Sequence, residues 1–216
     1  MQEKDTFIGA RSALLSDKLI KNLQARGFEA YYCGTSAEAV EKALSLISQD
    51  DSVSWGGSVT LEDTGLLGRV KQGGYTVIDR DTATSPEERA ELMRQALTCG
   101  TYLTSFNAMS EDGVLFNVDC NGNRVAASDF GPRRVIALVG MNKVCKTAQG
   151  AMERARSYAA PINVQRFSLQ STACAKTGSC GNCTSPECIC SYIVETRMCK
   201  TPGRIKVILI GETQGF

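Results

Sequence analysis

Six of the ten cysteines in this chain lie close together, between Cys174 and Cys199. Their spacing is C-x5-C-x2-C-x4-C-x-C-x8-C, and many of the residues between them are Gly, Ser, Thr, Asn or Pro. A cysteine buried only for packing behaves as a small apolar residue and needs no cysteine neighbours. The cluster therefore favours a loop folded around a metal ion or an iron–sulfur cluster. Disulfides, redox-active thiols and a loop without any ligand are the alternatives.

The chain contains no histidine. This excludes catalytic mechanisms that need an imidazole base, such as Ser-His-Asp and Cys-His systems. Any acid–base chemistry must use Asp, Glu, Lys, Tyr or Cys, and any metal site must be built from thiolates or carboxylates. An all-cysteine ligand set suits zinc or iron–sulfur and disfavours magnesium and calcium.

Composition narrows the functional class. With 216 residues, 43% hydrophobic and 22% charged, the chain can bury a core of ordinary size. A net charge of +1 without a basic run gives no support for nucleic-acid binding. We expect neither a signal peptide nor a membrane segment, and therefore a cytoplasmic protein with reduced thiols, which disfavours disulfides.

A glycine-rich segment, Gly56-Gly57-Ser58-Val59-Thr60, comes directly after an expected strand and opens an expected helix. Glycines let the backbone approach a ligand closely, and free N–H groups at such a turn attract anions. The alternative is that the glycines only make a tight turn and a hydroxyl caps the helix. The segment is neither a Walker A loop nor G-x-G-x-x-G, so it does not indicate a nucleotide.

Further polar residues follow other expected strands. Asn107 and Glu111 come after one of them, and a carboxylate there could act as a base or nucleophile, or simply belong to a turn. Asn142 and Lys143 follow the buried strand 134–139, where Lys143 would offer a point charge to an anion or lie in solvent. Asp119 belongs to a polar stretch whose Asn-Gly pair indicates a hairpin turn.

The elements that must position these residues alternate along the first half of the chain. Helices are expected at 6–26, 36–47, 59–70, 86–98 and 147–160, and strands at 29–33, 51–55, 75–78, 99–104, 134–139 and 205–210. Residues 113–119 and 124–127 are expected to pair as a small hairpin. Such alternation predicts an α/β fold with a parallel sheet covered on both faces, in which ligands sit at the carboxyl ends of the strands. Gly56, Asn107 and Lys143 would then border one pocket.

Four strings together resemble the LUD (lactate utilization) domain family over nearly the whole chain: WGGSVTLEDTGLL, TSFNAMSEDGVLFNVDCNGNRVAA, GPRRVIALVGMNKV and RIKVILIGETQGF. The resemblance implies a Rossmann-like, mostly parallel sheet of the NagB/RpiA/CoA-transferase-like group. One domain would span residues 1–216, with a cysteine-rich insertion at about 172–200. It also implies a cytoplasmic role in lactate-type organic-acid utilisation beside iron–sulfur redox proteins.

The resemblance also implies particular site residues. The family's short subfamily carries C-x5-C-x2-C-x6-C, which matches Cys174, Cys180, Cys183 and Cys190, and these would bind an iron–sulfur cluster or, alternatively, zinc. Cys188 and Cys199 are extra, and either could join or replace a ligand. CoA transferases of the fold group carry their catalytic Glu in Ser-Glu-x-Gly, which makes Glu111 the candidate catalytic carboxylate by analogy of fold.

Two functions remain open from the sequence, and in a further alternative the cysteine loop is only a structural element stabilised by zinc. In the first, the protein binds a small anionic metabolite, with the expected ligand-binding residues Gly56, Gly57, Ser58, Thr60, Asn107, Asp119, Asn142 and Lys143. In the second, it is a non-catalytic accessory that senses redox state or metal through its cysteines. Whether it is an enzyme stays open; a homo-oligomer is compatible with the sequence, and no nucleic acid or membrane is expected as a partner.

Overall fold

A computed structural model describes residues 3–216, with side chains from residue 6 onward. The main sheet has six strands, all parallel, in the order β1-β10-β7-β4-β2-β3. Their bounds are β1 Glu29–Cys33, β2 Ser52–Trp55, β3 Thr76–Ile78, β4 Thr101–Thr104, β7 Arg134–Gly140 and β10 Ile205–Ile210. The prediction of an α/β, Rossmann-like parallel sheet is confirmed.

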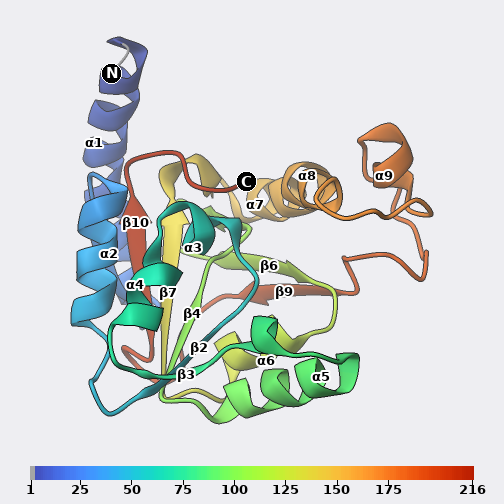
Figure 1. The fold of residues 1–216 in the computed structure, drawn as a ribbon. Helices are drawn as coiled ribbons and strands as arrows, with labels where there is room; N and C mark the ends of the chain where they lie inside the picture. Colours follow the sequence, from blue (N-terminus) through green and yellow to red (C-terminus); the bar gives the residue numbers. More distant parts are fainter. Residues whose placement is uncertain (1–2) are drawn as a thin grey trace.

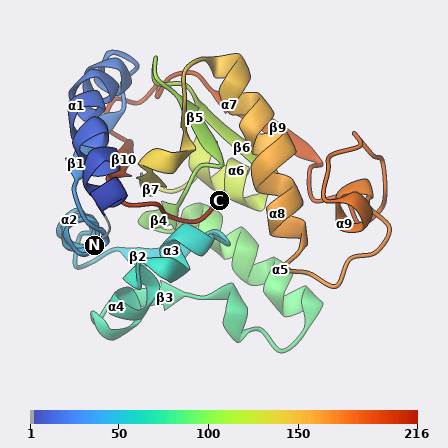
Figure 2. The same ribbon diagram turned by 90° about the horizontal axis from the view of Figure 1, so that it is seen from above.

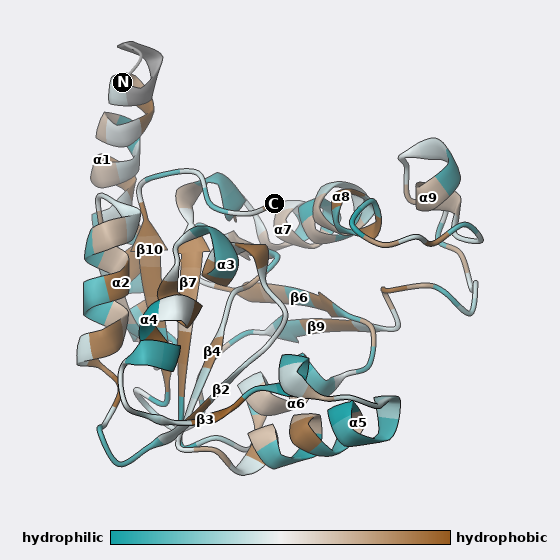
Figure 3. Ribbon diagram, viewed as in Figure 1, coloured by the Kyte–Doolittle hydropathy of each residue, from teal (hydrophilic) through white to brown (hydrophobic). Residues whose placement is uncertain are grey.

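Helices cover both faces of this sheet (Figure 1). One face packs against α2 (Ser36–Ser45), α3 (Val59–Asp63) and α4 (Leu66–Gln72), through the even-numbered residues Ile136 and Leu138 of β7. The other face uses the odd-numbered Val135 and Val139 and packs against α1 (Glu3–Ala25). This alternation follows from the two-residue period of a strand, and β7, apolar on both faces, is brown along its length in Figure 3.

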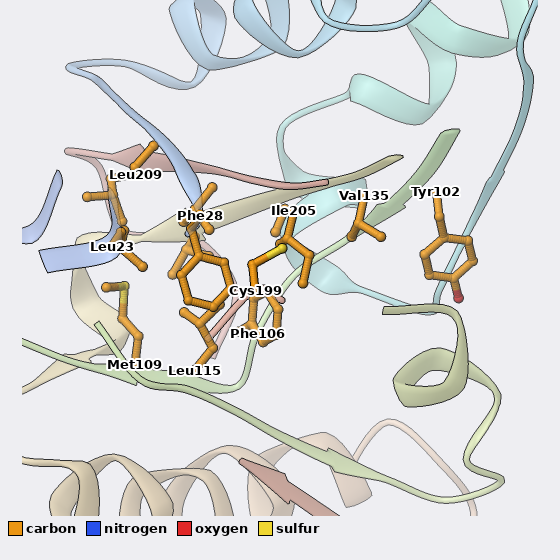
Figure 4. Close-up of a cluster of buried hydrophobic side chains, with 14 of the residues drawn as sticks. Leu23, Phe28, Tyr102, Phe106, Met109, Leu115, Val135, Cys199, Ile205 and Leu209 are labelled. Carbon is orange, nitrogen blue, oxygen red and sulfur yellow. The ribbon is translucent and has the colours of Figure 1, made fainter. Parts of the chain in front are cut away.

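A smaller, four-stranded sheet in the order β8-β5-β6-β9 lies beside the main one. Its strands are β5 Ala108–Ser110, β6 Leu115–Asp119, β8 Val144–Cys145 and β9 Tyr192–Thr196. Met109 and Leu115 join the core of the main sheet, as Figure 4 shows, whereas Ala108 and Phe116 face the helices α7 (Ala148–Arg154) and α8 (Ala160–Val164). A short π-helix, η4 (Ala155–Ala159), connects these two helices.

Several predicted boundaries move. The helix expected at 59–70 is broken at Gly65, whose φ of 73° ends α3 and allows α4 to start. The helix expected at 86–98 is α5 (Pro86–Gln95), opened by Ser85 as N-cap and followed by a 3₁₀ turn, η2 (Ala96–Thr98). Another 3₁₀ turn, η1 (Arg80–Thr82), follows β3.

The hairpin predicted around Asn121-Gly122-Asn123 is wrong. Residues 123–129 form a helix, α6 (Asn123–Asp129), and β6 instead pairs with β5 and β9. The carboxylate of Asp119 accepts hydrogen bonds from the backbone N–H groups of Arg124 (3.0 Å) and Val125 (3.1 Å). These bonds satisfy the free donors of a helix start, so the Asn-Gly pair leads into a helix.

The cysteine-rich segment projects from the body next to α8, on the side opposite α1 and α2 (Figures 1 and 2). It contains the short helix α9 (Ala173–Thr177) and ends in β9, which returns to pair with β6. The sequence did not predict this strand. Among residues 3–216, no helix is both long and apolar enough to cross a membrane.

Candidate functional site

A pocket of about 270 Å³ lies at the carboxyl ends of the central strands β2, β4 and β7. Its wall contains the segments that follow these strands: residues 57–60, residues 105–107, and Lys143 in the 3₁₀ turn η3 (Met141–Lys143). Phe216 also lines it, and Figure 2 shows the C-terminal segment lying between α3 and α8. The three segments are brought together because parallel strands end at the same edge of a sheet.

Lys143 is the most buried charged side chain of the pocket, with 3% of its surface exposed. Its Nζ donates hydrogen bonds to Thr60 Oγ1 (2.7 Å) and Ser105 Oγ (3.1 Å). Burial, followed by the positive charges of Arg154 and Arg124, lowers the pKa of Lys143 to about 7. Near neutral pH the side chain is therefore an equilibrium between ammonium and free amine.

Arg124 is the second cationic group of the wall. Its guanidinium donates to the carbonyl oxygen of Val118, to Asn107 Oδ1 (3.2 Å) and to the carbonyl oxygen of Ser105 (3.4 Å). Burial lowers the pKa of Arg124, although arginine stays protonated in proteins. Neither Arg124 nor Lys143 forms an ion pair with a carboxylate among the side chains that the structure describes.

Three more arginines line the pocket, and each of them has a carboxylate oxygen within 4 Å. Arg89 pairs with Asp81 at 2.8 Å, and Arg166 pairs with Glu62 at 3.1 Å. The buried Nε of Arg80 has no hydrogen-bond partner, and its closest carboxylate oxygen, on Asp81, is 3.8 Å away. Of the five cationic side chains that line the pocket, Lys143 and Arg124 have no ion pair to a described carboxylate, and Asp119 is the one acidic side chain of the lining. This balance favours an anionic ligand.

Most of the predicted ligand-binding residues lie in this wall: Gly57, Ser58, Thr60, Asn107, Asp119 and Lys143. Asn107 and Asp119 act mainly on Arg124, because Asn107 accepts from its guanidinium and Asp119 from its backbone N–H. Ser58 caps α3, with Oγ accepting from the N–H of Leu61 at 3.4 Å. Its hydroxyl proton is still available to a ligand.

Gly56 and Asn142 are not part of the wall but support it. A side chain at Gly56 would come within 2.8 Å of Arg124 Cδ and 3.0 Å of the Tyr102 hydroxyl oxygen, so only glycine lets Arg124 lie against the strand end. Asn142 holds the C-terminal segment: its Oδ1 accepts from the N–H of Gln214 (3.1 Å) and its Nδ2 donates to the carbonyl oxygen of Gly215 (3.4 Å).

Glu111 lies in the turn between β5 and β6 and does not line the pocket. Its carboxylate accepts from Lys18 at 2.6 Å and from Lys146 at 2.9 Å, and these bonds lower its pKa. The structure thus places the candidate catalytic carboxylate in a network of ion pairs, apart from the other predicted residues. Its catalytic role stays a prediction.

Sequence reasoning missed the arginines and Ser105. Arg80 comes two residues after β3 and could have been found by the same strand-end rule that selected Lys143. Ser105 directly follows β4 and could have been found in the same way. Arg89 and Arg166 have no such signal, because α5 and the end of α8 approach the pocket only in the folded molecule.

All ten cysteines are free thiols. In the cysteine-rich segment, burial raises the pKa of Cys190 to about 12. The neighbouring thiols of Cys188, Cys180 and Cys174 contribute to the same shift. The backbone of Ala173 and the thiol of Cys188 hydrogen-bond to Cys183 and lower its pKa. Four predicted ligands, Cys174, Cys180, Cys183 and Cys190, therefore lie in one neighbourhood together with Cys188.

The donor set of this loop fits a thiophilic metal, because sulfur is the only ligand type it offers in quantity. Among residues 3–216, however, no three Cys, Asp or Glu side chains stand close enough together to hold a metal ion. The loop thus brings the right chemical groups together without arranging them as a closed site.

The family model described as the LUD domain matches residues 16–210. The chain belongs to the LUD domain family. Among solved structures, this LUD domain is similar to a DUF162 family protein from Deinococcus radiodurans, with a TM-score of 0.56 and 13% sequence identity. The match covers 92% of this chain and 98% of the other. At that identity the similarity shows the fold alone. Comparison with curated proteins gives no match.

Proposed function

We propose that this LUD-domain protein binds a small anionic metabolite in the pocket at the ends of β2, β4 and β7. The family supports a role related to lactate utilisation, and the organic acids of such a pathway, or of a related redox pathway, are small anions. A single observation carries the proposal: among the described side chains, neither Lys143 nor Arg124 has an ion pair to a carboxylate, and Arg124 has only the more distant charge of Asp119 to offset its own. A buried cation without a counter-charge is costly, and an anionic ligand offsets that cost.

Different residues of the pocket wall would make different contacts with the anion. Arg124 is fixed in position by Asn107 and by two carbonyl oxygens, so it presents a rigid planar fork suited to a carboxylate or phosphate. Arg80 lies against Gly57, where an added side chain would come within 2.6 Å of its guanidinium. Ser58 supplies a hydroxyl next to these charges.

The test is calorimetric titration of the protein with inorganic phosphate and with malonate at constant ionic strength. We expect Arg124→Gln to weaken binding at least tenfold, because a charged hydrogen bond in a desolvated site contributes more than about 1.4 kcal/mol. Arg94→Gln is the matched control, since Arg94 lies exposed on α5 and pairs only with Glu91. Equal affinity in both variants, or no binding by the wild type, would reject the proposal.

A second variant separates binding from folding. Replacing Ser58 and Thr60 together by Ala removes two hydroxyls of the pocket wall and leaves every charge in place. We expect weaker anion binding with cooperative unfolding retained. Unchanged binding would show that the anion does not lie against residues 57–60.

The cysteine loop supports a second candidate function, in which the protein works with iron–sulfur redox partners as an electron-transfer or metal-sensing accessory. The observation that favours it is the gathering of Cys174, Cys180, Cys188 and Cys190. We propose that Cys174, Cys180, Cys183 and Cys190 hold an iron–sulfur cluster, with zinc as the alternative. A cluster would supply one-electron transfer, whereas zinc would stabilise the loop.

The spectrum of anaerobically purified protein, with iron and zinc measured on the same sample, decides between these ligands. Visible iron–thiolate absorbance with about four irons per chain indicates a cluster, and a colourless protein with about one zinc indicates a structural site. Cys183→Ser should lose the metal and Cys33→Ala, on β1, should keep it. Metal-free protein after anaerobic reconstitution would reject both ligands.

A further inference from the structure

Lys143 differs from an ordinary anion-binding lysine in the groups that surround it. Its Nζ contacts two neutral hydroxyls, those of Thr60 and Ser105, and no carboxylate of residues 6–216 bonds to it. The charged groups that act on it are Arg154 of α7, Arg124 of α6 and, in the opposite sense, Asp63 of α3. Two positive charges and burial therefore disfavour the ammonium form, which leaves a large share of free amine near neutral pH.

Lys146, three residues along the chain, provides the contrast. It is exposed, and its Nζ lies 2.9 Å from Glu111 Oε2. That ion pair raises the pKa of Lys146, so this lysine is an ammonium at pH 7. Only a free amine has the lone pair that attacks a carbonyl carbon. The two lysines thus differ in the property that nucleophilic chemistry requires.

The rest of the pocket complements an amine nucleophile. Arg124, which is fixed by its hydrogen bonds, and Arg80 both offer acid-binding groups within the same wall. The Oγ atoms of Ser105 and Thr60 are 3.5 Å apart and both contact the amine, so they can relay protons at the nitrogen. The cavity of about 270 Å³ has room for a small organic acid.

We propose that Lys143 forms a Schiff base with a small oxo acid whose acid group is bound by the pocket arginines. The inference rests on the proposed function, because it assigns the substrate class of the same pocket. The nitrogen of Lys143 forms a bond to the carbonyl carbon, and a proton from nitrogen reaches the former carbonyl oxygen, which gives a carbinolamine. Loss of that hydroxyl with a second proton, as water, leaves the imine. No oxidant or reductant takes part.

The experiment is reductive trapping in the full-length protein with glyoxylate, a carboxylate-bearing aldehyde, and sodium cyanoborohydride. The hydride converts the imine to a stable secondary amine, and peptide mass mapping locates it. We expect the label on Lys143, at up to one per chain, and at most a tenth as much on Lys146. Malonate should slow labelling of Lys143, and propanal, which has no acid group, should label it at least tenfold more slowly than glyoxylate.

The pH dependence of trapping tests, in the wild-type protein, whether Lys143 reacts as a free amine. Labelling of Lys143 should rise with a midpoint near pH 7, and labelling of Lys146 only at far higher pH. Lys143→Arg keeps a cation but removes the primary amine, so it should abolish the label at this position. Label spread over exposed lysines, with Lys143 at background while malonate binds, overturns the Schiff base and leaves the anion site intact. Absence of malonate binding overturns the proposed function itself.

Discussion

The pocket and the cysteine loop are organised in opposite ways. In the pocket, two cationic groups are held by hydrogen bonds to the wall: Lys143 donates to Thr60 and Ser105, and Arg124 donates to Asn107 and to backbone carbonyl oxygens. In the loop, the thiols lie between turns of Gly, Ser and Asn, and the main polar anchor is the carboxylate of Glu187, which accepts from the N–H groups of Gln170 and Ser171. The pocket is formed before a ligand arrives, whereas the loop brings thiols together that a metal would have to arrange.

The largest difference should appear when the apolar support of each region is removed. Phe106 is 1% exposed, lines the pocket and belongs to the core between the two sheets (Figure 4). We expect Phe106→Ala to lower the free energy of unfolding by about 3–5 kcal/mol, because it leaves a cavity. Ile189→Ala in the loop should lower it by less than about 1 kcal/mol, because this side chain, which also borders the pocket, is only partly buried. Urea unfolding measures both; equal losses would contradict the comparison.

Stabilisation by a bound metal should depend on the cysteine ligands of the loop. If Cys183 is a ligand, metal present at a hundredfold excess over its dissociation constant should stabilise the wild type by about 2.7 kcal/mol and Cys183→Ser far less. In metal-free protein the two should unfold alike, because serine is similar in size to cysteine and the Cys183 side chain is partly exposed. Thermal unfolding with and without a chelator tests this. An unchanged melting temperature after chelation of metal-loaded wild type rejects a stabilising site.

The buried amine of the pocket should reduce stability in a pH-dependent way. Between pH 7 and 10.5 the unfolded chain protonates Lys143 and the folded chain does not, so the penalty is complete below pH 7 and disappears as pH rises toward 10.5. Lys143→Met should therefore raise the free energy of unfolding by about 1–3 kcal/mol at pH 7.

Urea unfolding of the same variant at several pH values is the measurement, and its gain in stability should shrink as pH rises. Lys146→Met is the control, since its ion pair with Glu111 is exposed and adds little to stability. A gain for Lys143→Met that does not depend on pH would mean that Lys143 is not perturbed by its surroundings.

Two glycines with similar backbone angles provide the finest comparison. Gly215 (φ 55°) borders the pocket, and a side chain there would come within 2.6 Å of Thr60 Oγ1. Gly178 (φ 73°) lies in the cysteine loop, where nothing is within 4 Å. Gly178→Ala should cost about 1 kcal/mol from backbone strain alone, and Gly215→Ala somewhat more.

Anion titration adds a second measurement to this pair. Gly215→Ala should also weaken malonate binding, since its new side chain displaces the hydroxyl that holds Lys143. Gly178→Ala should leave malonate binding unchanged. Equal effects of the two substitutions on malonate binding would show that the C-terminal segment does not contribute to the anion site.

Local sequence patterns were enough to predict the main strands of this protein and several residues of the pocket wall. Apolar runs such as 134–139 and 205–210 gave the buried parallel strands, and the residues that directly follow strands gave Gly57, Thr60, Asn107 and Lys143 as members of one pocket. These predictions succeeded because strand period and strand-end position depend on neighbours in the sequence. The predicted ligand-binding role of these residues awaits the titrations.

Only the tertiary structure decided the rest. The stretch 124–127 became a helix because Asp119 reaches the N–H groups of its first turn, and β9 formed because β6 offers it an edge. Arg89 and Arg166 reach the pocket from α5 and from the end of α8, while Glu111 is held away from it by Lys18 and Lys146. The shift in the pKa of Lys143 likewise comes from burial and from arginines distant in sequence. Sequence spacing determines which residues follow the end of each strand. Only tertiary packing determines which charged side chains lie close to one another in the folded protein.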